Sequence, residues 1–343
     1  MVESVRKFNV AVVGATGAVG EAMLAILSQR SFPVGEVYAL ASTESEGKRV
    51  EFGEGGLSVT SLDSFDFNRV DIAFFSAGGD VSKVFAPKAA KSGAVVIDNT
   101  SAFRYDDDIP LVVAEVNPEQ VGAYENRGII ANPNCSTIQM VVALKPIHDM
   151  AEISRVNVAT YQAVSGSGKS GITELANQTS DLLNARAIQS NVYPAQIAFN
   201  CLPHIDEFQD NGYTKEEMKM VWETKKIMEC PSIEVNPTAV RVPVFFGHSE
   251  AVHFETNRKV SREQVTLALQ KAPGVTVIDD RKDGGYPTPI EHAVENDDVF
   301  VGRIREDISH PRGISMWVVS DNIRKGAALN SVQIAEILVQ SHL

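Results

Sequence analysis

The first 133 residues alternate between short apolar runs and stripes of apolar residues at helical spacing. Residues 8–13 are apolar except for Asn9, which is the pattern of a strand buried on both faces of a sheet. Gly14, Gly17 and Gly20 follow at intervals of three, and apolar residues then recur at helical spacing through residues 23–27. A strand, a glycine loop and a helix in this order are typical of the start of a dinucleotide-binding unit.

Further buried strands follow this opening. They are predicted at residues 36–40, 71–77, 94–98, 111–116 and 128–132. A crossover helix is predicted just after the strand at 71–77, with Asp80 as its N-cap. Strands that alternate with helices in this way predict an α/β fold with a doubly wound sheet, that is, a Rossmann-like domain.

The pattern changes after about residue 150, where the predicted strands become longer and half-polar. These strands are expected at residues 154–164, 239–256, 299–307 and 313–321. Helices are expected at residues 171–186, 214–228, 261–272 and 325–339. Long strands with polar alternation predict a mostly antiparallel sheet whose second face is solvated or covered by a partner.

This change divides the chain into two predicted domains. Residues 1–133, completed by a C-terminal helix at about 323–343, form the Rossmann-like domain, and residues 134–322 form an α+β catalytic domain. The length of 343 residues is sufficient for two domains that each bury a core.

Composition and charge exclude several classes of protein. No apolar run approaches the roughly 18 residues of a membrane span, and the N-terminus lacks the pattern of a secretory signal, so we expect a cytoplasmic protein. The three cysteines are far apart and form no C-x-x-C, which disfavours a disulfide framework or a zinc ribbon, and no metal site is predicted. A net charge of −13 disfavours nucleic acid but leaves anionic small substrates open to capture by local Arg and Lys.

Cys135 stands at a position typical of a catalytic thiol. The segment Asn132-Pro133-Asn134 interrupts an apolar run just before it, and a helical pattern begins at Ser136. The N–H groups and the dipole at a helix N-terminus favour a thiolate. We therefore predict that Cys135 is the nucleophile, and that Cys201 and Cys230, which lack this context, are structural.

A nucleophile needs a proton partner, and the chain has seven histidines. His248 follows Gly247 in a segment where a bulge would aim its side chain, but the sequence alone does not select it. Arg241 lies seven positions earlier, so an unbroken strand would point the two side chains to opposite faces. Pro243 and Gly247 make an unbroken strand doubtful, which leaves their convergence open.

A second glycine-containing segment suggests a different class of protein. Residues 163–170 fit a loosened P-loop pattern, which would indicate an ATPase or a kinase. Its first position is Ala163 rather than glycine, and no downstream strand ends in an Asp for magnesium. We favour a flexible loop whose backbone borders a cofactor.

The end of the second predicted strand bears on the choice of cofactor. The carboxylate that binds the ribose of NAD is replaced there by Ser42 and Thr43, which leaves room for the 2′-phosphate of NADP. Glu44 and Glu46 count against NADP, whereas Lys48 or Arg49 would offset them. We predict NADP.

Six segments, taken in order, resemble the aspartate-β-semialdehyde dehydrogenase family over nearly the whole chain. They are GATGAVG, SAFR, NPNCST, YQAVSGSG, EEMK and RVPVFFGHSE. The resemblance implies an NADP-dependent phosphorylating aldehyde dehydrogenase, which interconverts 4-aspartyl phosphate and aspartate 4-semialdehyde through a cysteine thioester. It also implies a homodimer and a place in the synthesis of lysine, diaminopimelate, threonine and methionine.

The resemblance further implies roles for individual residues. Cys135 matches the nucleophile, His248 the acid–base residue, and Gln162 the residue that orients the intermediate. The matched substrate and phosphate contacts are Arg241 for the α-carboxylate, Glu216 for the α-ammonium group, Arg104 and Lys219 for phosphate, and Asn134. The matched cofactor contacts are Gly14, Thr16, Gly17, Ala18, Val19, Ser42, Thr43, Ser165, Gly166 and Asn322.

One departure from the family pattern concerns the cofactor, and three competing functions stay open. Many members of the family carry Arg where this chain has Glu44, which makes use of both NAD and NADP more credible.

An N-acetyl-glutamyl-phosphate reductase would run the same chemistry, but its acetylated nitrogen would leave Glu216 without an ionic partner. The second competing function is a P-loop kinase that depends on Lys169, and the third is a paralogue that binds nucleotide without catalysis.

Overall fold

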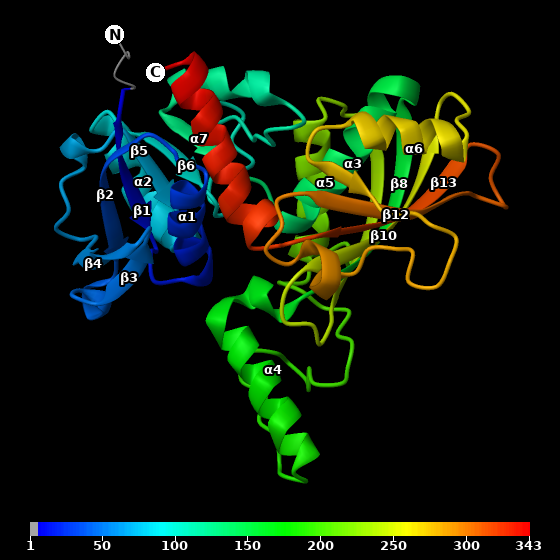
Figure 1. Cartoon of the computed structure of the whole chain (residues 1–343), viewed down its shortest axis with the longest axis horizontal. Helices are drawn as coiled ribbons and strands as arrows, with labels where there is room; N and C mark the ends of the chain where they lie inside the picture. Colours follow the sequence, from blue (N-terminus) through cyan, green and yellow to red (C-terminus); the bar gives the residue numbers. More distant parts are fainter. Residues whose placement is uncertain (1–5) are drawn as a thin grey trace. The chain divides into compact units, whose positions relative to one another are not determined.

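The computed structural model describes residues 6–343, which divide into two compact units (Figure 1). Unit 1 comprises the chain up to Pro133 together with residues 327–343, and unit 2 comprises residues 134–326. None of the helices within residues 6–343 is long and apolar enough to cross a membrane.

Unit 1 contains a seven-stranded sheet in the order β3-β4-β2-β1-β5-β6-β7. Its strands are β1 (Phe8–Val13), β2 (Val34–Ala41), β3 (Arg49–Phe52), β4 (Gly55–Ser61), β5 (Ile72–Phe75), β6 (Val95–Asp98) and β7 (Ile129–Ala131). All neighbours pair in parallel except β3 and β4, which form an antiparallel hairpin. The predicted doubly wound sheet is confirmed, although the hairpin was not predicted because its strands are short, polar and flanked by glycines.

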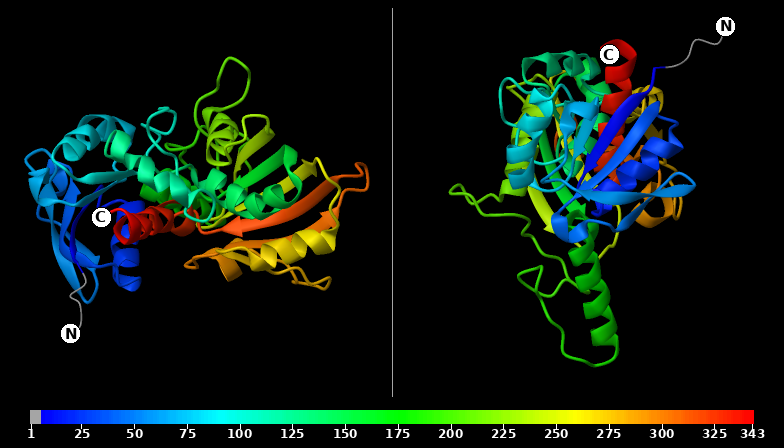
Figure 2. Two further views of the ribbon diagram at one scale, coloured as in Figure 1. Left: turned by 90° about the horizontal axis from the view of Figure 1, so that it is seen from above. Right: turned by 90° about the vertical axis from the view of Figure 1, so that its left-hand side faces the viewer.

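Helices cover both faces of this sheet. They are α1 (Ala18–Gln29), α2 (Gly79–Lys91) and α7 (Asn330–Ser341). The apolar stripe of α1, which includes Met23, Leu24 and Leu27, joins the core beneath β1, and α7 packs beside α1. α2 lies on the opposite face, as the views in Figure 2 show. This arrangement brings the C-terminal helix back into the first unit.

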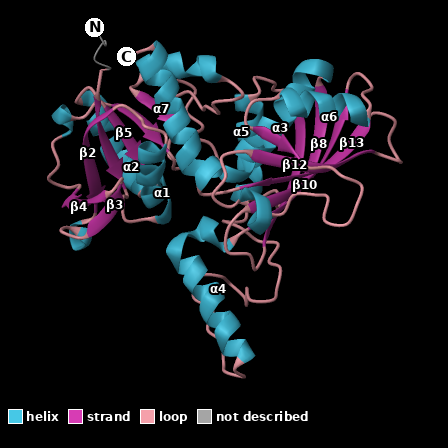
Figure 3. Ribbon diagram, viewed as in Figure 1, coloured by secondary structure: helices cyan, strands magenta, loops and turns pink. Residues whose placement is uncertain are grey.

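Unit 2 contains a six-stranded mixed sheet in the order β11-β12-β13-β10-β8-β9. Its strands are β8 (Ile153–Gln162), β9 (Glu234–Arg241), β10 (His248–Thr256), β11 (Val275–Val277), β12 (Val299–Glu306) and β13 (Gly313–Ser320). Its helices are α3 (Cys135–Ala151), α4 (Gly168–Leu183), α5 (Lys215–Ile227) and α6 (Arg262–Lys271). α3 lies between α5 and α6 on one face of the sheet, whereas α4 projects away from it (Figure 3).

Three sequence-based expectations about local structure were wrong. Residues 111–116 form no strand, because only Leu111 bridges to Ala131 and the Asn117 side chain binds the backbone of Leu111 and Val113. Helix α2 begins two residues earlier than predicted, at a cap of Gly78 with φ of +98°, so that Asp80 lies in the first turn.

The third error concerns residues 239–256, which form two strands rather than one. β9 ends at Arg241 and β10 begins at His248, and β8 lies between the two strands in the sheet. Pro243 has no N–H for a ladder and Gly247 has a φ of +83°, so the chain turns here. The sheet is mostly antiparallel, as predicted, although β8 pairs with β9 in parallel and β11 pairs with β12 in parallel.

Candidate active site

The glycine loop of unit 1 has the geometry that a dinucleotide pyrophosphate requires. Gly14 has a φ of +89°, and a Cβ there would lie 2.9 Å from the backbone nitrogen of Ala77. A Cβ on Gly20 would lie 2.2 Å from the Gly14 carbonyl oxygen, so only glycine permits this approach of helix to strand. Gly17 caps α1 without a side chain, which leaves the first-turn N–H groups open to a phosphate. These residues fit the cofactor.

The predicted contacts Thr16, Ala18 and Val19 belong to the same turn, and α1 begins at Ala18. Ser42 and Thr43 stand directly after the buried end of β2. This is the place where a ribose hydroxyl or a 2′-phosphate binds in such folds.

Charges near the end of β2 are mixed. Glu44 is exposed, and a hydrogen bond from Ser42, with Lys48 close by, lowers the pKa of its carboxyl group. The Lys48 ammonium group donates to the Ser45 hydroxyl at 3.2 Å. Arg49 instead extends along the β3–β4 hairpin and donates to the Gly56 carbonyl. Of the two cations weighed for a 2′-phosphate, Lys48 is therefore the one beside Ser42 and Glu44.

Cys135 is the first residue of α3, as predicted for a thiol at a helix N-terminus. The N-cap Asn134 accepts hydrogen bonds through Oδ1 from the N–H groups of Ser136 and Thr137, at 3.0 and 3.3 Å. A Cβ on Gly326 would lie 2.7 Å from the Cβ of Cys135, so glycine is required beside the thiol. The half-buried thiol is thus held at the positive end of a long helix.

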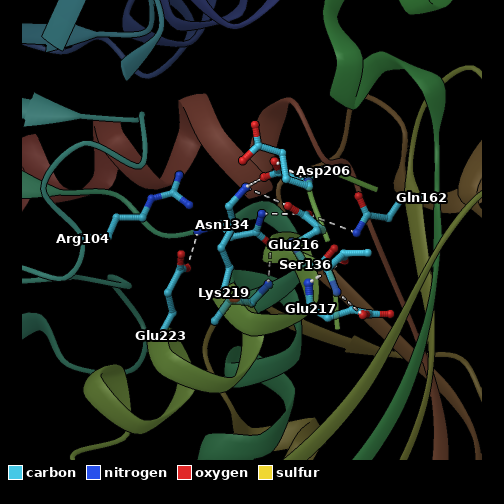
Figure 4. A network of polar contacts seen from close by, with 12 residues as sticks. Arg104, Asn134, Ser136, Gln162, Asp206, Glu216, Glu217, Lys219 and Glu223 are labelled. Atoms are coloured by element: carbon cyan, nitrogen blue, oxygen red, sulfur yellow. Dashed lines mark hydrogen bonds and ion pairs between the residues drawn. The ribbon is translucent and has the colours of Figure 1, made fainter. Parts of the chain in front are cut away.

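Helix α5 anchors this N-cap through two buried carboxylates (Figure 4). Glu223 accepts the backbone N–H of Asn134 at 2.6 Å. Glu216 accepts the side-chain amide of Asn134 at 2.9 Å and that of Gln162 at 3.2 Å. The two glutamates are seven residues apart, which places them on one face of α5. This spacing was visible in the sequence, but Glu223 was not predicted as a site residue.

The buried Glu216 and the half-buried Lys219 form an ion pair, and Lys219 also contacts the exposed Asp206. Lys219 donates to Glu216 at 3.0 Å and to Asp206 at 2.7 Å. Burial on its own raises the pKa of Glu216, but the positive charge of Lys219 and the amide of Asn134 outweigh it, and the pKa lies below its ordinary value. Burial likewise opposes the charge on Lys219, yet the two carboxylates raise its pKa. Both groups are therefore ionised at neutral pH.

Arg241 and His248 converge on residues 163–166 despite their separation in sequence. Arg241 donates to the carbonyl of Ala163 at 2.7 Å, and the Nδ1 of His248 accepts the N–H of the same residue at 3.0 Å. A Cβ on Gly166 would lie 2.9 Å from the Arg241 Nη1 and 3.5 Å from the His248 Nε2. The convergence that the sequence left open is therefore present, because the two residues belong to separate strands.

The environment of His248 fixes its protonation. Burial, followed by the nearby charge of Arg241, lowers the pKa of His248 well below its ordinary value. A backbone N–H only donates, so Nδ1 carries no proton and the neutral ring holds its proton on Nε2. Nε2 is buried and has no hydrogen-bond partner among residues 6–343. The ring therefore presents one unengaged N–H.

The predicted cofactor contacts Ser165, Gly166 and Asn322 lie together next to this pair. Asn322 bonds to the Ser165 hydroxyl at 3.0 Å and accepts the N–H of Gly247, the residue before His248, at 2.9 Å. Residues 164–167 form a single 3-10 turn before α4, and Ala163 binds Arg241 and His248. This segment therefore holds the two side chains in place and is not a P-loop.

Three further residues from the sequence analysis, Arg104, Cys201 and Cys230, each have local contacts of their own. Arg104 belongs to unit 1, where it is buried and donates to the Asn99 carbonyl at 2.8 Å. Cys201 is exposed and Cys230 is half-buried, and neither touches the groups described above. No group of three or more metal-ligating side chains exists within residues 6–343.

Two family profiles together match most of the chain. The NAD binding domain of semialdehyde dehydrogenases matches residues 9–124, and their dimerisation domain matches residues 144–325. With the glycine loop in unit 1 and the thiol of unit 2, the two domains define a semialdehyde dehydrogenase.

Individual relatives narrow the assignment. The chain is 63% identical to aspartate-semialdehyde dehydrogenase of Legionella pneumophila, over 98% of this chain and 97% of the relative. The crystal structure of aspartate semialdehyde dehydrogenase II of Vibrio cholerae complexed with ASA is 58% identical, with a TM-score of 0.97, and covers 98% of this chain and 100% of that one. The Candida albicans enzyme with NADP superposes with a TM-score of 0.76 at 27% identity, over 97% and 98% of the two chains.

The chain belongs to the aspartate-semialdehyde dehydrogenase family. This confirms the predicted family, the predicted oxidoreductase class with its nicotinamide dinucleotide, and the predicted place in the aspartate pathway. The kinase and the non-catalytic paralogue are thereby set aside.

Replacing Glu250 with glutamine tests the charge state of the acid that lies two residues beyond His248. Glu250 is fully buried, and burial raises its pKa well above 4.5. The neutral Glu250 side chain makes its full contribution to the stability of the folded protein at pH values below the unfolded-state pKa. This contribution is lost as the pH rises toward the folded-state pKa. Glu250→Gln removes this loss, so we expect a larger gain in melting temperature at about pH 8 than at about pH 5.

Glu255→Gln is the matched control, because Glu255 lies on the opposite face of the same strand and is only half-buried. No gain that grows with pH is expected for it. Equal shifts for Glu250→Gln at both pH values would show that Glu250 is ionised in the folded protein.

Proposed function

We propose that the protein reduces 4-aspartyl phosphate to aspartate 4-semialdehyde, reversibly and with NADP, through a thioester on Cys135. The observation that carries this proposal is the placement of the thiol at the N-terminus of α3, with its N-cap tied to the buried, ionised Glu216. When bound at the glycine loop, the nicotinamide dinucleotide supplies the hydride or accepts it.

Buried charges of opposite sign support an amino-acid substrate. Glu216 carries a negative charge suited to an α-ammonium group, and Arg241 presents a planar fork suited to an α-carboxylate. Arg241 also contributes to the lowered pKa of Glu216, so the two side chains lie within electrostatic reach of each other. An N-acetylated substrate would give Glu216 no positive partner, which favours the aspartyl compound. Arg104 and Lys219 are the proposed phosphate contacts.

The proposed chemistry uses the thiolate twice. The sulfur of Cys135 attacks the acyl carbon, the carbon–oxygen bond to phosphate breaks, and a thioester forms. Addition of hydride leaves a negative charge on the former carbonyl oxygen, where the Nε2–H of His248 acts as the acid–base group and hydrogen-bond donor. The carbon–sulfur bond then breaks, which releases the aldehyde and restores the thiolate. Gln162 and Asn134 orient the acyl group.

The packing of α3 on β10 supports the pairing of Cys135 with His248. Both elements run in the same direction, since Arg258, just after β10, bonds to Ala151 at the end of α3. Lower in this interface the Gln139 amide lies against the Glu250 carboxyl group. Cys135 lies four residues before Gln139 on the helix, and His248 lies two residues before Glu250 on the strand. Both steps are about 6–7 Å long. Because the two elements run in the same direction, these equal steps lead from the Gln139–Glu250 pair to the Cys135–His248 pair.

The outer face of the second sheet supports a homodimer. Tyr161 is 38% exposed and packs against Trp317 at 5.4 Å between ring centroids, next to the exposed Ala251. The helices α3, α5 and α6 cover the opposite face, and the matching family profile is that of a dimerisation domain. The aromatic residues exposed on this part of the sheet are suited to contact with a second copy. We therefore include a cytoplasmic homodimer in the proposal.

The direct test of this function is phosphate-dependent formation of NADPH from aspartate semialdehyde. We expect the wild type to be active and Cys135→Ala to fall to background, because no other thiol occupies a helix N-terminus in the site. Cys201→Ala and Cys230→Ala serve as controls and should keep wild-type rates. Activity in Cys135→Ala, or turnover that ignores phosphate, would refute the assignment.

Lys48→Met tests the choice of NADP over NAD. We expect the wild type to have the higher kcat/KM with NADP, and Lys48→Met to raise the KM for NADP about tenfold, as for one lost charge-assisted bond. The KM for NAD should stay unchanged, because NAD has no 2′-phosphate. Arg49→Met is the control and should alter neither value. A clear advantage of NAD in the wild type would overturn the prediction of NADP.

A further inference from the structure

Four polar side chains of unit 1 close a hydrogen-bonded circuit, which we call the asparagine ring. Asn330 donates to Oδ1 of Asn132 at 2.6 Å, Asn132 donates to Oδ1 of Asn99 at 2.9 Å, and Asn99 donates to Oγ of Ser331 at 2.9 Å. Asn330 and Ser331 are neighbours at the start of α7, which closes the circuit. Asn132, Asn330 and Ser331 are fully buried.

The backbone fixes the direction of every bond in the asparagine ring. Asn330 accepts the N–H of Ala114 at 3.1 Å and donates to the carbonyl of Val112 at 2.9 Å. Its oxygen and nitrogen therefore cannot exchange places without two repulsive contacts. The orientation of Asn330 sets that of Asn132, which in turn sets that of Asn99. The ring thus has one arrangement and leaves the segments it joins little freedom.

Two of these segments lead to groups of the proposed site. Asn132 opens the turn Asn132-Pro133-Asn134 that ends at Cys135. The backbone carbonyl of Asn99 accepts Nη2 of Arg104, the proposed phosphate contact, at 2.8 Å. Helix α7 is therefore hydrogen-bonded, through Asn132, to the segment that leads to the thiol. Through Asn99 it is linked to the segment that contains the arginine.

We propose that Asn330 and Ser331 of α7 are positioning residues: they fix Asn132, which opens the cysteine turn, and Asn99, whose carbonyl holds the phosphate-binding arginine. This rests on the proposed roles of Cys135 and Arg104. Removing Asn330 takes a hydrogen-bond partner from the Asn132 oxygen, the Ala114 N–H and the Val112 carbonyl. Removing the Ser331 hydroxyl takes one from the Asn99 amide and the Ala327 carbonyl. Asn330 therefore acts on both segments, and Ser331 acts mainly on the arginine.

Kinetics of Asn330→Ala and Ser331→Ala in the phosphate-consuming direction test this role. For both variants we expect the KM for phosphate to rise about tenfold, the effect of one buried polar group left unpaired. For Asn330→Ala we also expect kcat and the rate of Cys135 alkylation by iodoacetamide to fall. The KM for NADP should not change, because the glycine loop lies outside the ring.

Gln333→Ala is the matched control. Gln333 lies on the same helix and binds Glu115 at 2.9 Å, beside the segment that Asn330 contacts, but it is no member of the ring. It should leave the KM for phosphate and the alkylation rate within about twofold of the wild type, as expected for a surface contact.

Two results would overturn the proposal. One is an unchanged KM for phosphate in a folded Ser331→Ala protein, which remains informative if Asn330→Ala does not fold. The other is a fall in kcat that is equal to the fall in the amount of titratable Cys135, with all KM values unchanged. A merely structural defect would give that result. Alkylation needs no turnover, so if the wild type lacks phosphate-dependent activity and the proposed function fails, an unchanged alkylation rate in a folded Asn330→Ala protein is the result that overturns the proposal.

Discussion

The site depends on the bond network that holds Asn134 at the N-terminus of α3. Asn134 caps the helix through its side-chain oxygen, gives its amide to Glu216, and gives its backbone N–H to Glu223. Losing one partner of a buried, charged hydrogen bond costs about 1–3 kcal/mol or more. Asn134 makes two such bonds, to Glu216 and Glu223, and together with the cap they keep the first turn of α3, and therefore Cys135, in a single position.

The same network explains how an acidic protein accommodates an anionic substrate. The chain has a net charge of −13, yet charged groups of opposite sign alternate in unit 2, from the exposed Asp206 through Lys219 to the buried Glu216 and Arg241. Lys219 lowers the pKa of Glu216 and Glu216 raises that of Lys219, so this pair remains ionised despite burial. His248 differs because burial and then the nearby charge of Arg241 both lower its pKa, so it remains neutral. One site thus combines fixed charges for recognition with a neutral donor.

Much of this could be predicted from the sequence. The Rossmann-like sheet and the helix at Cys135 follow from local patterns, because buried parallel strands are continuously apolar and a glycine loop has few structural alternatives. The split of residues 239–256 was visible only as doubt at Pro243 and Gly247. Glu223 and the asparagine ring were missed, since their partners are 33 to 232 residues away and no period in the sequence records such contacts. Only the spacing of Glu216 and Glu223 gave a signal.

The central claim is that Cys135 forms the covalent bond to the substrate. Mass spectrometry of peptides, after the wild type is mixed with 4-aspartyl phosphate in the absence of reduced cofactor, measures this directly. The account predicts an aspartyl adduct on the peptide that contains Cys135, which disappears when NADPH is added. An adduct on Cys201 or Cys230, or no adduct on a protein that turns over, would contradict it.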